Sequence, residues 1–244
     1  FMPEETTGVK DFFSVASDPG SVLGDRVVNE LLPVVALLRL KLHGLIIHFG
    51  FESEQGQETR DSGPLRLSAS LSRPGLIGTQ GTKKRTLTLD EAAYASVGGS
   101  NALRELSKLG KENSDFSVSF WIYIDSRGEG VWRSVLYKGH ENNLSDPTQE
   151  NRTFAMFLYP DSNILHYRIG TKNNPNEGGD STRELPVGEW MHIAYVKRGN
   201  LLEIYFKGTQ DSFTKLSNDV VANNDRLYIG RSPYAEGFRG ALDD

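Results

Sequence analysis

The amino-acid sequence predicts an all-β fold, an antiparallel sandwich of two sheets, and three observations favour it. Glycine accounts for 25 of the 244 residues, which is above the usual share of about 7% and indicates many tight turns. Short apolar and aromatic runs recur after residue 44, and Gly, Asn, Asp and Pro separate them. No long amphipathic helix stands between the runs, which argues against a doubly wound α/β fold and favours a sandwich.

The composition excludes several classes of function. Lys and Arg total 27 and Asp and Glu total 32, so the net charge is −5. Because nucleic-acid binding depends largely on neutralised phosphates, this balance argues against a nucleic-acid partner. The chain has no Cys, which removes disulfide scaffolds, Cys-ligated metal centres and Cys nucleophiles. The most apolar stretch, residues 31–51, does not read as a membrane span, because it is interrupted by Pro33, Arg39, Lys41, His43 and His48.

Residues 1–42 are predicted to form an N-terminal extension that is partly helical. Several of its apolar residues follow the i, i+3, i+4 spacing of a helix, although Pro33 argues against one straight helix. Burying a Leu or Val side chain stabilises a protein by roughly 1.5–3 kcal/mol, so such a segment normally packs against something. We therefore expect the extension to dock on the sandwich or on a partner through Val27, Leu31, Leu32, Val35 and Leu38.

The main domain is predicted to run from residue 43 to residue 244. Its expected strands span residues 44–51, 85–89, 93–97, 116–124, 133–139, 153–159, 164–170, 189–197, 201–208 and 226–230. Two short polar links, 161–163 and 198–200, predict hairpins. The Gly- and Asn-rich segment 172–183 is predicted to be a surface loop, and the Leu spacing over 101–109 predicts one helix.

Alternation along three of these strands separates core residues from candidate ligand-binding residues. In the strand 116–124 the predicted core face carries Phe116, Val118, Phe120, Ile122 and Ile124. The opposite face, and the non-core faces of 164–170 and 201–208, combine aromatic rings with polar groups. A sugar suits such a surface, because its apolar face stacks on rings while its hydroxyls bond polar groups. The candidate ligand-binding residues are Trp121, Tyr123, His166, Arg168, Glu203 and Tyr205. The alternative interpretation is that both faces of these central strands are covered, because loops and the N-terminal segment pack over one sheet.

Four segments together resemble a known family. They are the strand Phe116–Ile124, the W-x-H-x-A pattern of Trp190–Ala194, the strand Leu202–Gly208, and Ile229-Gly230 with Phe238–Asp244. Their order and spacing resemble the concanavalin A-like jelly roll of laminin G-like domains, and residues 43–63 resemble that family's opening strand and turn. The resemblance implies a jelly-roll sandwich over 43–244. It also implies a last strand that begins at the Asp-Asp pair; we expect that strand to be missing from this sequence or to be replaced by the segment before residue 43.

The resemblance further implies a Ca²⁺ site, because domains of this fold often hold that ion with carboxylate and carbonyl oxygens. Glu52 and Asp243 are the candidate ligands, and solvated turn acids are the alternative interpretation. Glycosidases of this fold carry paired carboxylates as E-x-D-x-x-E on one strand. This sequence lacks that triplet, and it also lacks a Ser-His-Asp pattern, a phosphate loop and an H-E-x-x-H motif. We therefore expect no enzymatic activity.

These observations predict a non-catalytic recognition module that binds a glycan or a protein surface. The alternative is a structural subunit of a larger assembly, which could be an organellar one. Such a subunit would keep the lectin-like fold but bind no ligand. A glycosidase ranks third. The compartment stays open, because the resemblance suggests an extracellular or surface location and the alternative an intracellular one. Two N-x-S/T sequons make Asn143 and Asn151 candidate glycosylation sites if the protein is secreted.

Overall fold

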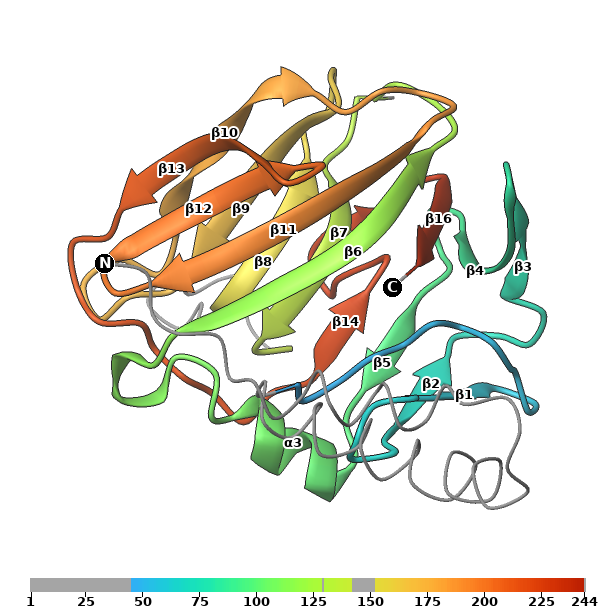
Figure 1. The fold of residues 1–244 in the computed structure, drawn as a ribbon, viewed down its shortest axis with the longest axis horizontal. Helices are drawn as coiled ribbons and strands as arrows, with labels where there is room; N and C mark the ends of the chain where they lie inside the picture. Colours follow the sequence, from blue (N-terminus) through green and yellow to red (C-terminus); the bar gives the residue numbers. More distant parts are fainter. Residues whose placement is uncertain (1–44, 129, 142–151, 244) are drawn as a thin grey trace, which may run out of the picture. The chain divides into compact units, whose positions relative to one another are not determined.

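A computed structural model of the chain describes residues 45–128, 130–141 and 152–243 (Figure 1). Residues from Ile46 onward form one unit. Two groups of predictions lie outside the described residues. They are the helical extension 1–42, with its docking residues Val27, Leu31, Leu32, Val35 and Leu38, and the sequon asparagines Asn143 and Asn151.

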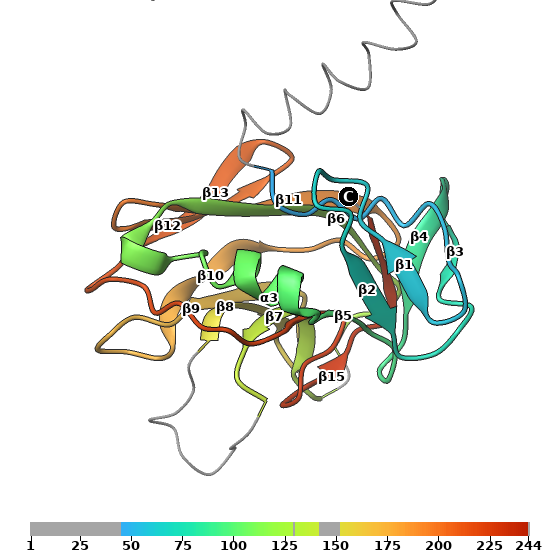
Figure 2. The ribbon, with the colours of Figure 1, turned by 90° about the horizontal axis from the view of Figure 1, so that it is seen from below.

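Two sheets make up the fold, and all but one of their strand pairings are antiparallel. The nine-stranded sheet has the order β1 (Glu58–Arg60), β2 (Ser68–Leu71), β5 (Ala95–Val97), β14 (Leu227–Ile229), β7 (Arg133–Gly139), β8 (Arg152–Leu158), β9 (Ile164–Ile169) and β10 (Glu177–Glu184), with β15 (Glu236–Gly237) parallel to β7. The seven-stranded sheet has the order β13 (Thr209–Lys215), β12 (Leu201–Phe206), β11 (Trp190–Arg198), β6 (Phe116–Ile124), β16 (Gly240–Asp243), β4 (Lys83–Leu89) and β3 (Ile77–Gln80). Figure 2 shows the sheets stacked as two layers, which confirms the predicted sandwich.

The core lies between the two sheets and is built by alternation along the strands. On β6 the side chains of Phe120, Ile122 and Ile124 are 6%, 1% and 1% exposed, as the period of two predicts. Phe116 of β6 and Phe154 of β8 bridge the layers with ring centroids 5.9 Å apart. Burying apolar side chains from both sheets is the main stabilising contribution to this fold.

One α-helix accompanies the strands in the described part of the chain, where the Leu spacing predicts it. Helix α3 (Ser100–Leu106) buries Ala102 and Leu106, and a single 3₁₀ turn (Lys111–Asn113) follows it. Among the described residues, no helix is both long enough and apolar enough to span a membrane.

The predicted opening strand 44–51 is wrong as a strand. Phe49 and Phe51 are buried, but residues 45–54 join no ladder. The local backbone is bonded elsewhere: the His48 amide donates to Asp61 Oδ1 at 2.6 Å, and the His48 carbonyl accepts from the Ser62 amide at 2.8 Å. A turn centred on the buried Asp61 therefore holds this apolar segment in the core.

The predicted loop 172–183 is also wrong in its second half, because Glu177–Glu184 forms β10. A Cβ on Gly178 would lie 2.1 Å from the carbonyl oxygen of Tyr167, so glycine lets β10 approach β9 this closely. The composition indicated a loop because the strand is polar and lies at the edge of its sheet, where few of its side chains are buried.

Candidate functional site

An exposed tryptophan lies at the start of β7, an inner strand of the nine-stranded sheet. Trp132 directly precedes β7 and is 40% exposed, and its neighbour Val131 is 43% exposed. The indole ring contacts the rings of Tyr159 and His166, with centroids 4.6 and 4.9 Å away. A large aromatic ring held in place and still open to solvent is the usual platform for a flat, partly apolar ligand.

The loops that carry this ring are tied together. The buried guanidinium of Arg133 donates from Nη2 to the carbonyl oxygens of Tyr159 at 2.9 Å and Ser162 at 2.7 Å. The Gly130 amide donates to the Pro160 carbonyl at 2.8 Å. These bonds join the β6–β7 loop to the β8–β9 turn, so the tryptophan stands on a braced support.

Asp180 completes this surface from the neighbouring strand. The register of β9 and β10 places it opposite His166. Its Oδ1 lies 2.7 Å from His166 Nδ1 and 3.6 Å from Arg168 Nη2, and its Oδ2 accepts the Tyr159 hydroxyl at 3.1 Å. We call Trp132, Tyr159, His166, Arg168 and Asp180 the Trp132 surface.

The charged and polar groups of the Trp132 surface differ in how far they are exposed to solvent. The side chain of Asp180 is 42% exposed, whereas those of His166 and Arg168 are 14% and 13% exposed. Burial, reinforced by the nearby Arg168, lowers the pKa of His166, so the ring is neutral at pH 7. Burial also raises the pKa of the Tyr159 hydroxyl, and the bond to Asp180 adds to the effect. A ligand therefore meets the indole ring and the carboxylate first.

The sequence prediction found two of these five residues. It named His166 and Arg168 from the alternation of β9. Asp180 was assigned to a loop, so its pairing with His166 could not be foreseen. Trp132 and Tyr159 each flank a strand end, and their position directly beside β7 and β8 was the available signal.

The predicted Trp121 and Tyr123 lie on the outer face of the seven-stranded sheet. Tyr123 packs on Trp190 with centroids 5.4 Å apart. The Lys83 ammonium lies 5.1 Å from the ring centroid of Trp121 and 5.3 Å from that of Trp190, and it also pairs with Asp243. We call these residues the Lys83 cluster. Its rings already bind a cation from the chain itself.

The last predicted pair, Glu203 and Tyr205, lies on β12. Glu203 is 3% exposed, which corrects the expectation that it faces solvent. Its Oε1 accepts from Arg198 at 3.2 Å, from the Tyr205 hydroxyl at 3.1 Å and from Gln210 at 2.9 Å. Strand β11 separates β12 from β6, and β9 belongs to the other sheet. The six predicted residues therefore form three separate groups, not one patch.

The candidate metal ligands are not brought together. The Glu52 side chain is 78% exposed and lies 3.9 Å from Arg85, and Asp243 is paired with Lys83. In the described ranges, no three His, Asp or Glu side chains are grouped so as to hold a metal ion.

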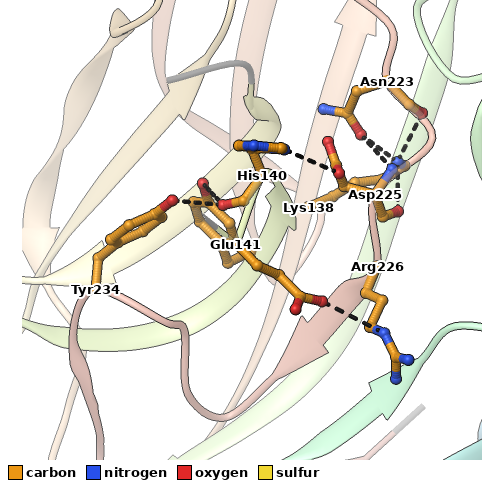
Figure 3. Close-up of polar contacts among 8 residues, drawn as sticks. Lys138, His140, Glu141, Asn223, Asp225, Arg226 and Tyr234 are labelled. Atoms are coloured by element: carbon orange, nitrogen blue, oxygen red, sulfur yellow. Dashed lines mark hydrogen bonds and ion pairs between the residues drawn. The ribbon is translucent and has the colours of Figure 1, made fainter. Parts of the chain in front are cut away.

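A fully buried lysine forms a further polar cluster, at the end of β7 (Figure 3). Lys138 Nζ donates to the Asn223 carbonyl at 3.1 Å, to Asn223 Oδ1 at 2.7 Å and to the Asp225 carbonyl at 3.0 Å. Next to it, His140 Nδ1 lies 3.3 Å from Asp225, and the Tyr234 hydroxyl donates to the His140 carbonyl at 2.6 Å. Burial lowers the pKa of Lys138 to about 8. An ammonium group enclosed by carbonyls fixes the segment before β14.

Comparison with known proteins assigns the family. Residues 96–244 match the family profile of the concanavalin A-like lectin/glucanases superfamily. The chain belongs to this superfamily. The match confirms the resemblance seen in the sequence motifs. A search of curated proteins gives no match.

The superfamily fold is also found in solved toxin structures at low sequence identity. The binding domain of botulinum neurotoxin serotype D matches with a TM-score of 0.56 and 11% identity, over 81% of this chain and 47% of that one. The binding domain of Paraclostridial Mosquitocidal Protein 1 matches with a TM-score of 0.54 and 16% identity, over 81% and 47%. The chain spans less than half the length of these toxin domains. At this identity the likeness concerns the fold.

Proposed function

We propose that this domain is a non-catalytic module that binds a glycan at the Trp132 surface. The observation that carries the proposal is a tryptophan that is 40% exposed beside a carboxylate whose side chain is 42% exposed, both held by tied loops and paired strands. Sugars bind by stacking their C–H face on an aromatic ring while polar groups take their hydroxyls. The two similar toxin structures are binding domains by description, which supports a recognition role.

The surroundings of the carboxylates support a role without catalysis. A glycosidase needs two carboxyl groups about 5–5.5 Å or about 6.5–9.5 Å apart across the scissile bond. Asp180 is bonded to His166 and Tyr159 and lies beside Arg168. Glu203 is buried among its own partners. These two acids serve as fixed hydrogen-bond acceptors in our proposal, not as a catalytic pair.

The test is calorimetric titration with a panel of soluble oligosaccharides, comparing the wild-type chain with Trp132→Ala. We expect binding of at least one oligosaccharide with wild type and a loss of roughly thirtyfold or more in the variant, because the stacking platform is removed. Phe213→Ala is the matched control, because Phe213 is 65% exposed on β13. That variant should bind like wild type. Equal binding by Trp132→Ala, or no binding of any oligosaccharide by wild type, would refute the proposal.

A further inference from the structure

The cation of the Trp132 surface lies beneath its anion. Arg168 is 13% exposed on its side chain, and its Nη1 already donates to the carbonyls of Tyr167 at 3.0 Å and Gly179 at 2.6 Å. Asp180, above it, is 42% exposed. An approaching ligand therefore reaches the carboxylate before the guanidinium. The positive charge offsets Asp180 from below and is not presented to a ligand.

The other polar groups at this surface also favour a ligand that donates hydrogen bonds. A carboxylate can only accept, so the neutral His166 ring donates from Nδ1 to Asp180 and keeps Nε2 as an acceptor. The Tyr159 hydroxyl uses its hydrogen on Asp180. Asp161, which is exposed in the β8–β9 turn, places a second negative charge near Tyr159.

We infer that the Trp132 surface selects a neutral pyranose, with its C–H face on Trp132 and its hydroxyls donated to Asp180, and rejects uronic and other acidic sugars. This inference rests on the proposed glycan-binding function and names the ligand class of the same site. A sugar carboxylate brings a charge of the same sign as Asp180 and Asp161, and it offers acceptors where donors are needed. Repulsion between two carboxylates a few ångströms apart at a protein surface weakens binding by roughly tenfold or more.

The experiment compares ligands that differ only at C6, where a carboxylate replaces the hydroxymethyl group. Cellotetraose and its fully C6-oxidised counterpart, a tetramer of β-1,4-linked glucuronate, share linkage and ring configuration. Neutral galacto- and manno-oligosaccharides with their uronate counterparts extend the comparison to other configurations. Each ligand is titrated into the whole chain by calorimetry at pH 7. We expect each neutral ligand that binds to bind at least tenfold more tightly than its uronate.

Two variants separate this inference from a general effect on the fold. Asp180→Asn keeps the side-chain size but removes the charge, so it should weaken neutral-ligand binding by roughly tenfold and strengthen uronate binding. Opposite changes for two ligands cannot come from a loss of folding. Asp161→Asn is the matched control and should leave the neutral-ligand affinity within about twofold, because Asp161 is exposed and affects the site only through its field.

The outcomes separate the two claims. Uronates that bind as well as or better than their neutral counterparts would overturn the inference and leave the glycan-binding proposal standing. The same holds if Asp180→Asn weakens both ligands equally. If no ligand of either class binds, both the proposed function and the inference are refuted.

Discussion

The two outer faces of this sandwich each gather aromatic rings beside a charged pair, yet they use them in opposite ways. On the seven-stranded sheet, Lys83 lies against the rings of Trp121 and Trp190 and is held there by Asp243. On the nine-stranded sheet, the Arg168 side chain is only 13% exposed and Trp132 is 40% exposed. The difference is that Lys83 lies against the rings themselves, whereas Arg168 is enclosed beside Asp180 and bonded to backbone carbonyls.

This contrast shows why an aromatic residue on a non-core face is a weak indicator of a binding site. The Lys83 ammonium makes cation–π contacts with the rings of Trp121 on β6 and Trp190 on β11. These contacts join β4 to both strands, so the Lys83 cluster stabilises the sheet. Because Arg168 is enclosed beside Asp180, the indole ring and the carboxylate stay open to a ligand. The Trp132 surface should therefore govern affinity, and the Lys83 cluster should govern stability.

The largest expected effect comes from truncating one tryptophan on each face. Trp132→Ala should lower glycan affinity by roughly thirtyfold or more and lower the free energy of unfolding by only about 1 kcal/mol, because the ring packs on Tyr159 and His166 but is 40% exposed. Trp121→Ala should lower the free energy of unfolding by roughly 2–3 kcal/mol, since it removes a half-buried ring from Lys83, and it should leave the affinity alone. Calorimetric titration and urea unfolding measure the two quantities. If Trp121→Ala is fully folded and still loses glycan affinity, the contrast between the two faces is contradicted.

Lys138 extends the comparison to a cation that is enclosed completely. Lys138→Met should lower the free energy of unfolding by about 2 kcal/mol at pH 7, because three acceptor contacts at Asn223 and Asp225 lose their donor. The pKa of Lys138 is about 8 in the folded chain and 10.5 in the unfolded chain. The unfolded chain therefore binds more protons between these values, and wild type should gain stability relative to the variant as the pH rises from 8 to 10.5. If the difference between the urea midpoints of wild type and Lys138→Met does not change from pH 8 to pH 10.5, this account is contradicted.

Removing the cation from the Lys83 cluster should have a smaller effect. Lys83→Met keeps the length of the side chain and loses the ammonium group, which costs about 1 kcal/mol for a partly exposed cation–π contact and ion pair. Glycan affinity should not change. An increase in affinity would instead show that Lys83 blocks a second ligand site on Trp121 and Trp190.

The smallest expected effect is a pH dependence at His166. Its pKa lies below the ordinary 6.5 because of burial and the nearby Arg168; Arg152 contributes in the same direction, and Asp180 opposes the shift. As the pH falls through 6.5 the unfolded chain takes up the proton first, so stability is lost until the folded-state pKa is passed. His166→Phe keeps the ring contacts and should lack this loss between pH 7 and pH 5. Identical thermal-denaturation profiles for the two proteins would contradict the assignment.

The sequence predicted most of the fold because the signals for it are local. Nine of the ten expected strands are present, since apolar alternation directly reflects burial on one face of a sheet. In the two segments that were predicted wrongly, local hydrogen bonding and the position of the strand in the sheet decide the structure, and burial does not. Residues 45–51 are apolar yet bonded to the turn at Asp61, and β10 is polar because it is an edge strand whose approach to β9 depends on Gly178.

The candidate site was predicted only in part because it depends on which strands are neighbours. Alternation gave the faces of β6, β9 and β12 but not the sheet to which each belongs. Asp180 meets His166 only through the register of β9 and β10. The burial of Glu203 depends on Arg198 and Gln210, and Gln210 belongs to β13, a strand that had not been predicted.

The central claim is that Trp132, and not the two tryptophans of the Lys83 cluster, contacts the ligand. The chain has three tryptophans, so its ¹⁵N spectrum contains three indole resonances, which Trp→Phe variants assign. Titration with a neutral oligosaccharide that binds should shift the Trp132 indole resonance and leave those of Trp121 and Trp190 in place. Shifts confined to Trp121 and Trp190, with Trp132 unmoved, would contradict the account.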